Sequence, residues 1–120
     1  MLKIDDHELM EVAFRFERAA GKVYRDARQA VTKTISDMSV AAKIHAPVRT
    51  GNLRNSIRHR EVTASTDMIV GEVNPGATYA IYVEYGTSRM GPQPFMHPAY
   101  DQHVGAFKQA MQQLAERALS

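Results

Sequence analysis

The stretch YAIYVEYGTSRMGPQPFMHPAY, from Tyr79 to Tyr100, decides the fold because its character changes twice. From Tyr79 to Tyr85 the side chains alternate between two faces, and this period of two predicts a β-strand. Gly86 ends the strand, and the prolines that follow exclude regular structure up to residue 95. Pro98 stands where a helix can begin. Proline has no backbone N–H, and this is tolerated in the first turn because the N–H groups there have no acceptor within the helix. We therefore expect a strand, a stiff loop and a helix start in direct succession.

The part of the chain before this stretch begins with helical patterns. Apolar residues recur at helical spacing from Leu9 to Ala20, and Gly21 interrupts them, so we expect one helix to end there. A second and longer helix is predicted from Val23 to His45, ended by Pro47. The first residues, Leu2 to Ile4, are compatible with a short strand.

Strand patterns follow the long helix. After one or two helical turns at residues 53–57, residues 58–64 and 68–73 alternate as two strands of a hairpin. Residues 74–76 read Asn-Pro-Gly, which is a strong turn signal before the strand that starts at Tyr79. Three successive strands predict an antiparallel meander.

The last helix carries a narrow apolar stripe with alternating spacings of four and three, formed by Tyr100, Val104, Phe107, Met111, Leu114 and Ala118. Such a stripe indicates that the helix packs on the rest of the fold. The fold class expected is α+β: N-terminal helices including one long helix, a small antiparallel sheet of three to four strands, and a C-terminal helix packed on it. From a length of 120 residues, of which 44% are hydrophobic, we expect residues 1–120 to form a single domain.

Composition excludes several classes of function. The chain has no cysteine, so thiolate catalysis, thiolate metal sites and disulfides are excluded. No window approaches the roughly 20 apolar residues of a membrane span, and acidic residues near the N-terminus argue against an export signal. We expect no membrane association and a chain that stays in the compartment where it is made. A formal charge of +2 is too small to predict nucleic-acid binding by itself.

No catalytic or cofactor-binding pattern is present in the sequence. The five histidines show no pair at metal-ligand spacing; they are His7, His45, His59, His97 and His103. The glycines stand alone rather than in a phosphate-binding loop, and no serine lies in a GxSxG turn. We therefore predict no enzyme activity, no metal and no cofactor.

One dense basic cluster lies between the long helix and the hairpin, formed by Arg49, Arg54, Arg58, His59 and Arg60. These side chains can contact DNA phosphates or acidic patches of a neighbouring subunit. Alternatively, they guard a solvated edge strand against unwanted pairing. Edge protection explains Arg58 and Arg60 but not Arg49 or Arg54, so both interpretations stay open.

Two further features suggest contacts. The tyrosines of the Tyr79 stretch are either core residues or a stacking platform for bases, and Tyr82, beside Glu84, is the best contact candidate. The loop that follows is either a stiff connection or a binding element that projects Arg89, Met90 and Phe95. We favour the binding element, because exposed apolar side chains on a rigid base usually meet a protein partner.

Two motifs carry a family resemblance: APVRTGNLRNSI at Ala46 to Ile57, and YAIYVEYGTSRM followed by PQPFMHPA. Together they resemble the small morphogenesis proteins of long-tailed bacteriophages, called tail-component, tail-completion or head-tail joining proteins. The matching positions are Pro47, Thr50, Gly51, Leu53, Ser56, Tyr79, Val83, Glu84, Tyr85, Gly86, Thr87, Pro94, Phe95 and Pro98. Arg49 departs from the acidic residue often found at its place in that family.

The resemblance implies a structural virion protein, from a phage, a prophage or a related tail-like particle. It implies a homo-oligomeric ring, with a hexamer favoured, at the neck or tail top around the channel for genomic DNA. Implied partners are tail terminator, tail tube or head-side connector proteins, and the implied location is the virion, with assembly in the host cytoplasm. A nucleic-acid-binding module is the alternative.

The residue patterns and the resemblance together give expected roles to individual residues. The expected protein interface consists of Tyr82, Arg89, Met90, Phe95 and Met96. The expected contacts to DNA or a subunit are Arg49, Arg54, Arg58 and Arg60. Backbone geometry is expected to depend on Pro47, Gly51, Gly86, Pro94 and Pro98.

Overall fold

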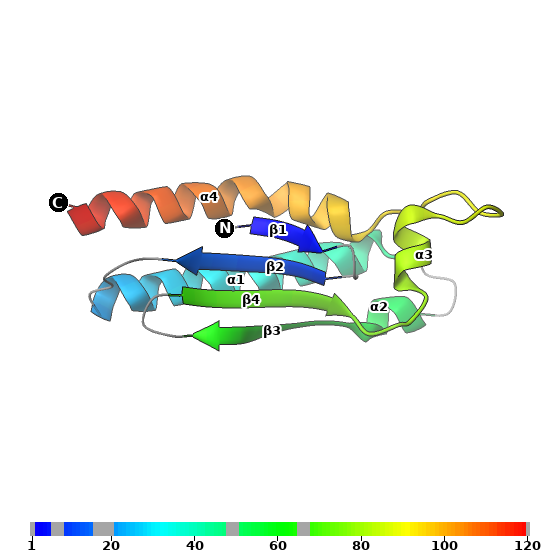
Figure 1. The fold of residues 1–120 in the computed structure, drawn as a ribbon, viewed down its shortest axis with the longest axis horizontal. Coiled ribbons are helices and arrows are strands. Elements are labelled where there is room, and N and C mark those ends of the chain that lie inside the picture. The colour runs from blue at the N-terminus through cyan, green and yellow to red at the C-terminus, as the bar shows by residue number, and fades with distance from the viewer. Residues whose placement is uncertain (1, 6–8, 16–20, 48–50, 65–67, 120) are drawn as a thin grey trace.

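The computed structural model of the chain describes residues 2–5, 9–15, 21–47, 51–64 and 68–119. These residues form four strands and four helices (Figure 1). In chain order the elements are β1 (Leu2–Asp5), β2 (Leu9–Arg15), α1 (Gly21–His45), α2 (Asn52–Ser56), β3 (Ile57–Ala64), β4 (Met68–Pro75), α3 (Ala80–Tyr85) and α4 (Met96–Leu119).

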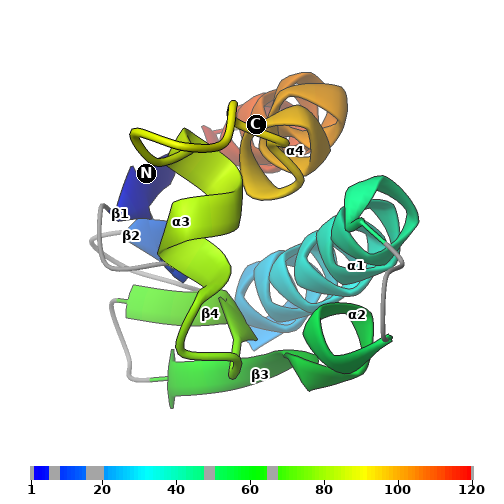
Figure 2. The same cartoon turned by 90° about the vertical axis from the view of Figure 1, so that its right-hand side faces the viewer.

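The strands form one antiparallel sheet in the order β1-β2-β4-β3. The β3–β4 pairing carries an irregularity between Glu61 and Thr63. Helices α1 and α4 lie side by side on one face of this sheet, so the fold has two layers (Figure 2). The molecule is elongated, with extents of 55 × 21 × 20 Å.

Helix α1 supplies the centre of the core. Its buried residues Ala27, Val31, Ile35 and Met38 recur every three or four positions, and this stripe packs against the sheet and α4. Gly71 of β4 makes a close approach possible, because a Cβ atom there would lie 2.9 Å from two carbons of Ile35. The core continues through Phe107, Met111 and Leu114 of α4 and through Ile57, Ile69 and Val73 of the β3–β4 hairpin.

Several sequence-based predictions are confirmed. The α+β class, the long helix, the β3–β4 hairpin and the packed C-terminal helix are all present. The short strand suggested by Leu2 to Ile4 is β1.

The predicted helix from Leu9 is wrong over its described part, since residues 9–15 form β2. Its apolar spacing is also compatible with a strand, because Met10, Val12 and Phe14 alternate. The backbone of β2 pairs with β4 on one side and β1 on the other, and this tertiary pairing overrides the helical pattern. Residues 16–20 lie outside the described part.

The predicted strand from Tyr79 to Tyr85 is also wrong, because residues 80–85 form α3. The amide of Val83 donates to the carbonyl of Tyr79 and that of Gly86 donates to Tyr82, as in a helix. Consequently the predicted meander does not form. Only its first two strands exist, and β2 rather than the Tyr79 segment pairs with the free side of β4.

Candidate functional site

A buried carboxylate joins α3 to the start of α4. Oε1 of Glu84 accepts hydrogen bonds from the amides of Phe95 (3.0 Å) and Met96 (2.9 Å), and Oε2 accepts one from the amide of His97 (3.1 Å). The first four N–H positions of a helix have no helical acceptor, and here the fourth is Pro98, which has no donor. Glu84 therefore caps the whole N-terminus of α4 from another helix. Its negative charge also matches the positive end of the helix dipole.

The environment of Glu84 favours the ionised form. Burial alone would raise the pKa of this carboxyl, but the hydrogen bonds from Met96, Phe95 and His97 outweigh burial and hold the pKa below its ordinary value. Nδ1 of His97 lies 2.5 Å from Oε2 and belongs to the same cluster. The His97 ring also packs edge-on against Tyr85, with ring centroids 5.6 Å apart. The Glu84 side chain thus has a structural role, which is to hold the start of α4.

The loop between α3 and α4 is fastened to itself and to α3. Thr87 and Met90 exchange backbone hydrogen bonds of 2.8 and 3.4 Å, and the Thr87 hydroxyl accepts from the amides of Arg89 and Met90. Farther along, the amide of Gln93 donates to the carbonyl of Val83 at 2.8 Å. Gly86 turns the chain with φ +81°, and a Cβ atom there would lie 2.8 Å from the nitrogen of Pro92. The loop therefore presents its tip from a fixed base.

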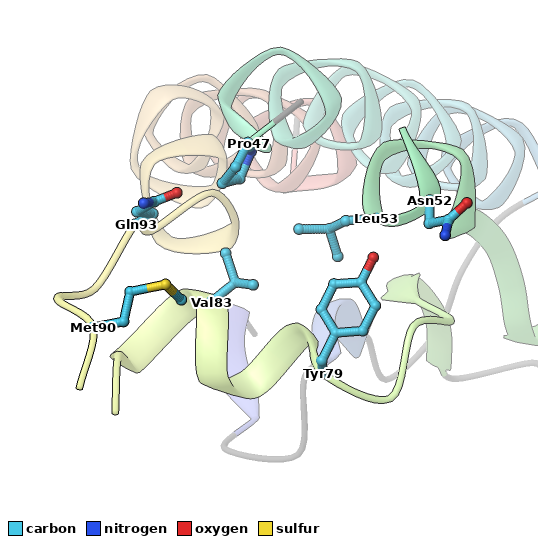
Figure 3. Close-up of a pocket in the computed structure, with 7 residues that line it drawn as sticks. All are labelled: Pro47, Asn52, Leu53, Tyr79, Val83, Met90 and Gln93. Atoms are coloured by element: carbon cyan, nitrogen blue, oxygen red, sulfur yellow. The ribbon is translucent and has the colours of Figure 1, made fainter. Parts of the chain in front are cut away.

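An open groove of about 690 Å³ lies at this end of the molecule (Figure 3). One side comes from Pro47, two residues after α1, and from α2, and the other from Tyr79, α3 and the loop that follows α3. The side chains of Leu53, Tyr79 and Val83 point toward one another across it. Its lining is mostly apolar and consists of Pro47, Asn52, Leu53, Tyr79, Val83, Met90 and Gln93.

Exposed apolar side chains lie at the same end of the molecule as this groove. Six large hydrophobic residues of the described part are exposed: Val40, Ile44, Tyr79, Tyr82, Tyr85 and Met90. All of them belong to the last part of α1, to α3 with its preceding residue, or to the loop after α3. Figure 1 shows these three segments at the same end of the molecule. We call these six residues and the groove the apolar end.

The predicted interface residues separate into two groups. Tyr82, Arg89 and Met90 are exposed, with 57% exposure for Tyr82 and 41% for Met90. Phe95, which we expected to project from the loop, is fully buried, and Met96 is 3% exposed. That expectation is wrong because both residues lie in the core, where their amides are fixed by Glu84.

The predicted basic cluster does not form one set of unpaired cations. Nε of Arg54 donates to the carbonyl of Lys43 (3.2 Å), Arg58 donates to the carbonyls of Asn55 and Ile57, and Arg60 pairs with Glu72 at 2.6 Å. Arg49, like Thr50, lies outside the described residues. Arg58 and Arg60 are exposed on β3 at the end of the strand order, which fits the edge-strand interpretation of those two residues.

The residues predicted to be critical for backbone geometry occupy varied positions. Gly51 has φ 77° immediately before α2, and Gly86 has φ 81° after α3, a region that favours glycine. Pro47 lines the groove, Pro94 is exposed in the loop, and Pro98 lies in the first turn of α4. Their importance stays a prediction that substitution can test.

Sequence reasoning missed the groove and the capping role of Glu84. A signal for the cap was present, since Glu84 is the single acidic residue between Gly76 and Phe95 and precedes a proline-rich helix start. The groove had no comparable signal, because it depends on α3 being a helix. Within the described ranges, no group of three His, Cys, Asp or Glu side chains is placed to hold a metal ion. Among the described helices, none combines the length and apolarity needed to cross a membrane.

The fold and its groove define a scaffold that presents apolar surface, and one comparison identifies the family. A family model described as "Bacteriophage HK97-gp10, putative tail-component" matches residues 10–86. The chain belongs to this family of phage tail components. The match includes the first motif and the second as far as Gly86, so the resemblance found in the sequence is confirmed. No curated protein and no solved structure matches the chain.

Proposed function

We propose that this structural protein of a tailed phage acts in tail completion or head-tail joining, as a subunit of a ring at the neck or tail top. Family membership supports a structural protein of a tailed phage. The observation that carries the finer assignment is the apolar end, where six exposed hydrophobic side chains and a groove lined by two of them, Tyr79 and Met90, lie at one end of the molecule. Large contiguous apolar patches on soluble proteins usually mark contact sites.

The apolar end is suited to contacts between virion parts. It lies at one end of a long molecule, so a contact there leaves the sheet and most of α4 available for other neighbours. In the proposed assembly those neighbours are further copies of the chain, in a ring of six, together with tail terminator, tail tube or connector proteins. Genomic DNA passes through the channel of the ring.

The nucleic-acid-binding alternative has less support. Arg54, Arg58 and Arg60 each hold a different partner within the chain, whereas a phosphate-binding surface needs its cations directed at the ligand. Tyr82 and Tyr85 are exposed on the short helix α3 rather than on a sheet face, which is where stacking platforms for bases are usually built.

Deletion of the gene from a phage or inducible prophage that carries it tests the proposal. We expect DNA-filled heads and tails to accumulate unjoined or with unfinished tail tops in electron micrographs, and a plasmid copy to restore joined particles. Mass spectrometry of purified wild-type virions should detect the chain. Normal particles and full infectivity after deletion, or absence of the chain from virions, would overturn the proposal.

A further inference from the structure

We propose that the groove is the docking site for an acidic segment of a neighbouring virion protein, which inserts an apolar side chain between α2 and α3. This inference rests on the proposed function and names the chemistry of one partner. It combines three observations: the apolar lining, the charge of the surrounding chain and the fixed geometry of the walls.

The lining selects an apolar anchor. Among the lining residues, Leu53 from α2 is 3% exposed and Val83 is partly buried, while Tyr79 and Met90 are both 41% exposed. An aliphatic or aromatic side chain entering here would cover the exposed parts of Tyr79 and Met90. Buried aromatic contacts of this kind carry much of the binding energy of protein interfaces.

The charge around the groove selects an acidic partner. The described parts of the two segments that contribute the lining, residues 43–47, 51–58 and 76–95, contain four Lys or Arg residues, which are Lys43, Arg54, Arg58 and Arg89. They contain a single acidic residue, Glu84, and its carboxylate is buried and occupied by the start of α4. Arg54 and Arg58 donate to backbone carbonyls, which are uncharged acceptors, and Arg89 is exposed and next to Met90 in the sequence. Carboxylates on the partner would complement this excess.

The walls are already in place without a partner. The Gln93 amide ties the loop to Val83, and the amide of Asn55 donates to the carbonyl of Gly51 at the start of α2. Preformed walls lower the ordering cost of binding, so a short segment can bind with useful affinity. The apolar lining favours a peptide over DNA, whose backbone offers charge but no apolar anchor.

The test uses the full chain and fluorescent 15-residue peptides that tile the other structural proteins encoded beside this gene. Binding is measured by fluorescence anisotropy at low and physiological salt. We expect saturable binding of one or a few peptides that contain both acidic and large apolar residues, weaker at higher salt. Replacing the acidic residues of a bound peptide by their amides should reduce affinity on the order of tenfold.

A matched pair of tyrosine variants locates the site. Tyr79→Ala should weaken peptide binding on the order of tenfold, whereas Tyr82→Ala, which removes a more exposed tyrosine outside the groove lining, should leave it unchanged. Arg89→Glu should weaken binding, and Arg25→Glu on the exposed face of α1 should not. Circular dichroism confirms that each variant is folded.

The proposal fails if no tiled peptide binds, if bound peptides lack acidic residues, or if Tyr79→Ala binds like the wild type. It also fails if a 30-base-pair DNA duplex displaces the peptide and shows the same variant pattern, since the groove would then be a DNA site. If the peptide experiments fail but the chain is present in virions and is needed for joined particles, only the docking site is overturned. Absence from virions would overturn the proposed function whatever the peptides do.

Discussion

Glu84 is the residue whose structural role is most specific, because one carboxylate satisfies three helix amides. Glu84→Gln keeps one acceptor oxygen but removes the charge and adds a donor facing other donors. We expect a loss of about 1–3 kcal/mol in the free energy of unfolding, the range for hydrogen bonds to charged groups. Urea unfolding followed by circular dichroism measures it. Glu116→Gln, at an exposed site on α4, is the control and should change stability by less than about 0.5 kcal/mol.

The same residue predicts a pH dependence. Its pKa in the folded protein is lowered, so the stabilisation is complete above the unfolded-state value near 4.3 and is lost as the pH falls through the lower folded value. The stability difference between wild type and Glu84→Gln should therefore shrink as the pH is reduced from 7 to 3. Urea titrations at each pH measure it. Repeating the comparison in a His97→Asn background removes the neighbouring imidazole. If the stability difference made by Glu84→Gln then stays constant with pH, the ionised Glu84 carboxylate does not have the stabilising role described.

Residues of the Tyr79 to Tyr100 stretch show what a sequence can and cannot predict at this scale. The backbone constraints of Gly86 and Pro98 can be inferred from the sequence because they are local, and Gly86 does have a positive φ. Phe95 was misplaced because an apolar residue between prolines has the same local pattern whether it projects or turns inward. Its side chain lies in the core, and its amide is held by Glu84, which is 11 residues earlier in the sequence. Such a contact leaves no periodic signal.

At the scale of elements, the packing of α1 on β4 depends on the missing side chain of Gly71. A Cβ atom there would lie 2.9 Å from Cδ1 and Cγ2 of Ile35 and 3.0 Å from Cγ1 of Val31. Gly71→Ala should therefore destabilise the protein by roughly 1–3 kcal/mol through overpacking. Gly105→Ala is the control, because Gly105 lies in α4 with open space around its Cβ position. That change should stabilise by about 0.5–1 kcal/mol, since alanine is the better helix former.

A double-mutant cycle assigns the effect to the helix–sheet contact. Ile35→Val removes Cδ1, one of the two nearest atoms, and should cost about 0.5–1.5 kcal/mol alone. Combined with Gly71→Ala it should cost less than the sum of the two single changes, by at least about 0.5 kcal/mol. Strictly additive costs would mean that the helix and sheet do not meet at Gly71 as described.

The elements that sequence predicted correctly are those with long, unambiguous periodicity. The long helix α1 and the stripe of α4 each repeat over many turns, and the β3–β4 hairpin is close in sequence. Helix α3 has only six residues. Its buried residues Ala80 and Glu84 are four positions apart and would share one face in a helix or in a strand, so their spacing does not distinguish the two. For β2, the partner strand β4 is far along the chain, so pairing rather than local pattern decides its structure.

At the scale of the whole molecule, the fold places the apolar end at one end of a protein that is 55 Å long. The sequence predicted that apolar contacts exist but not that they converge, because convergence requires α1, α3 and the loop to end at the same place. This arrangement brings the end of α1 that carries Ile44, 70% exposed, to the same end of the molecule as α3, which carries Tyr82, although the two residues are far apart in the sequence. Substitutions near the two ends of α1 can therefore test the apolar end separately from the rest of the helix.

Ile44→Glu and Gln29→Glu are therefore a matched pair on α1. Both positions are exposed, both changes add one negative charge, and 15 residues of helix place them roughly 22 Å apart. If assembly uses the apolar end, Ile44→Glu should prevent a plasmid copy from restoring joined particles in the deletion phage, because a charge would be buried without a partner. Gln29→Glu should restore them to the wild-type level. Equal plaque counts for the two variants, with both folded by circular dichroism, would show that the apolar end is not an assembly surface.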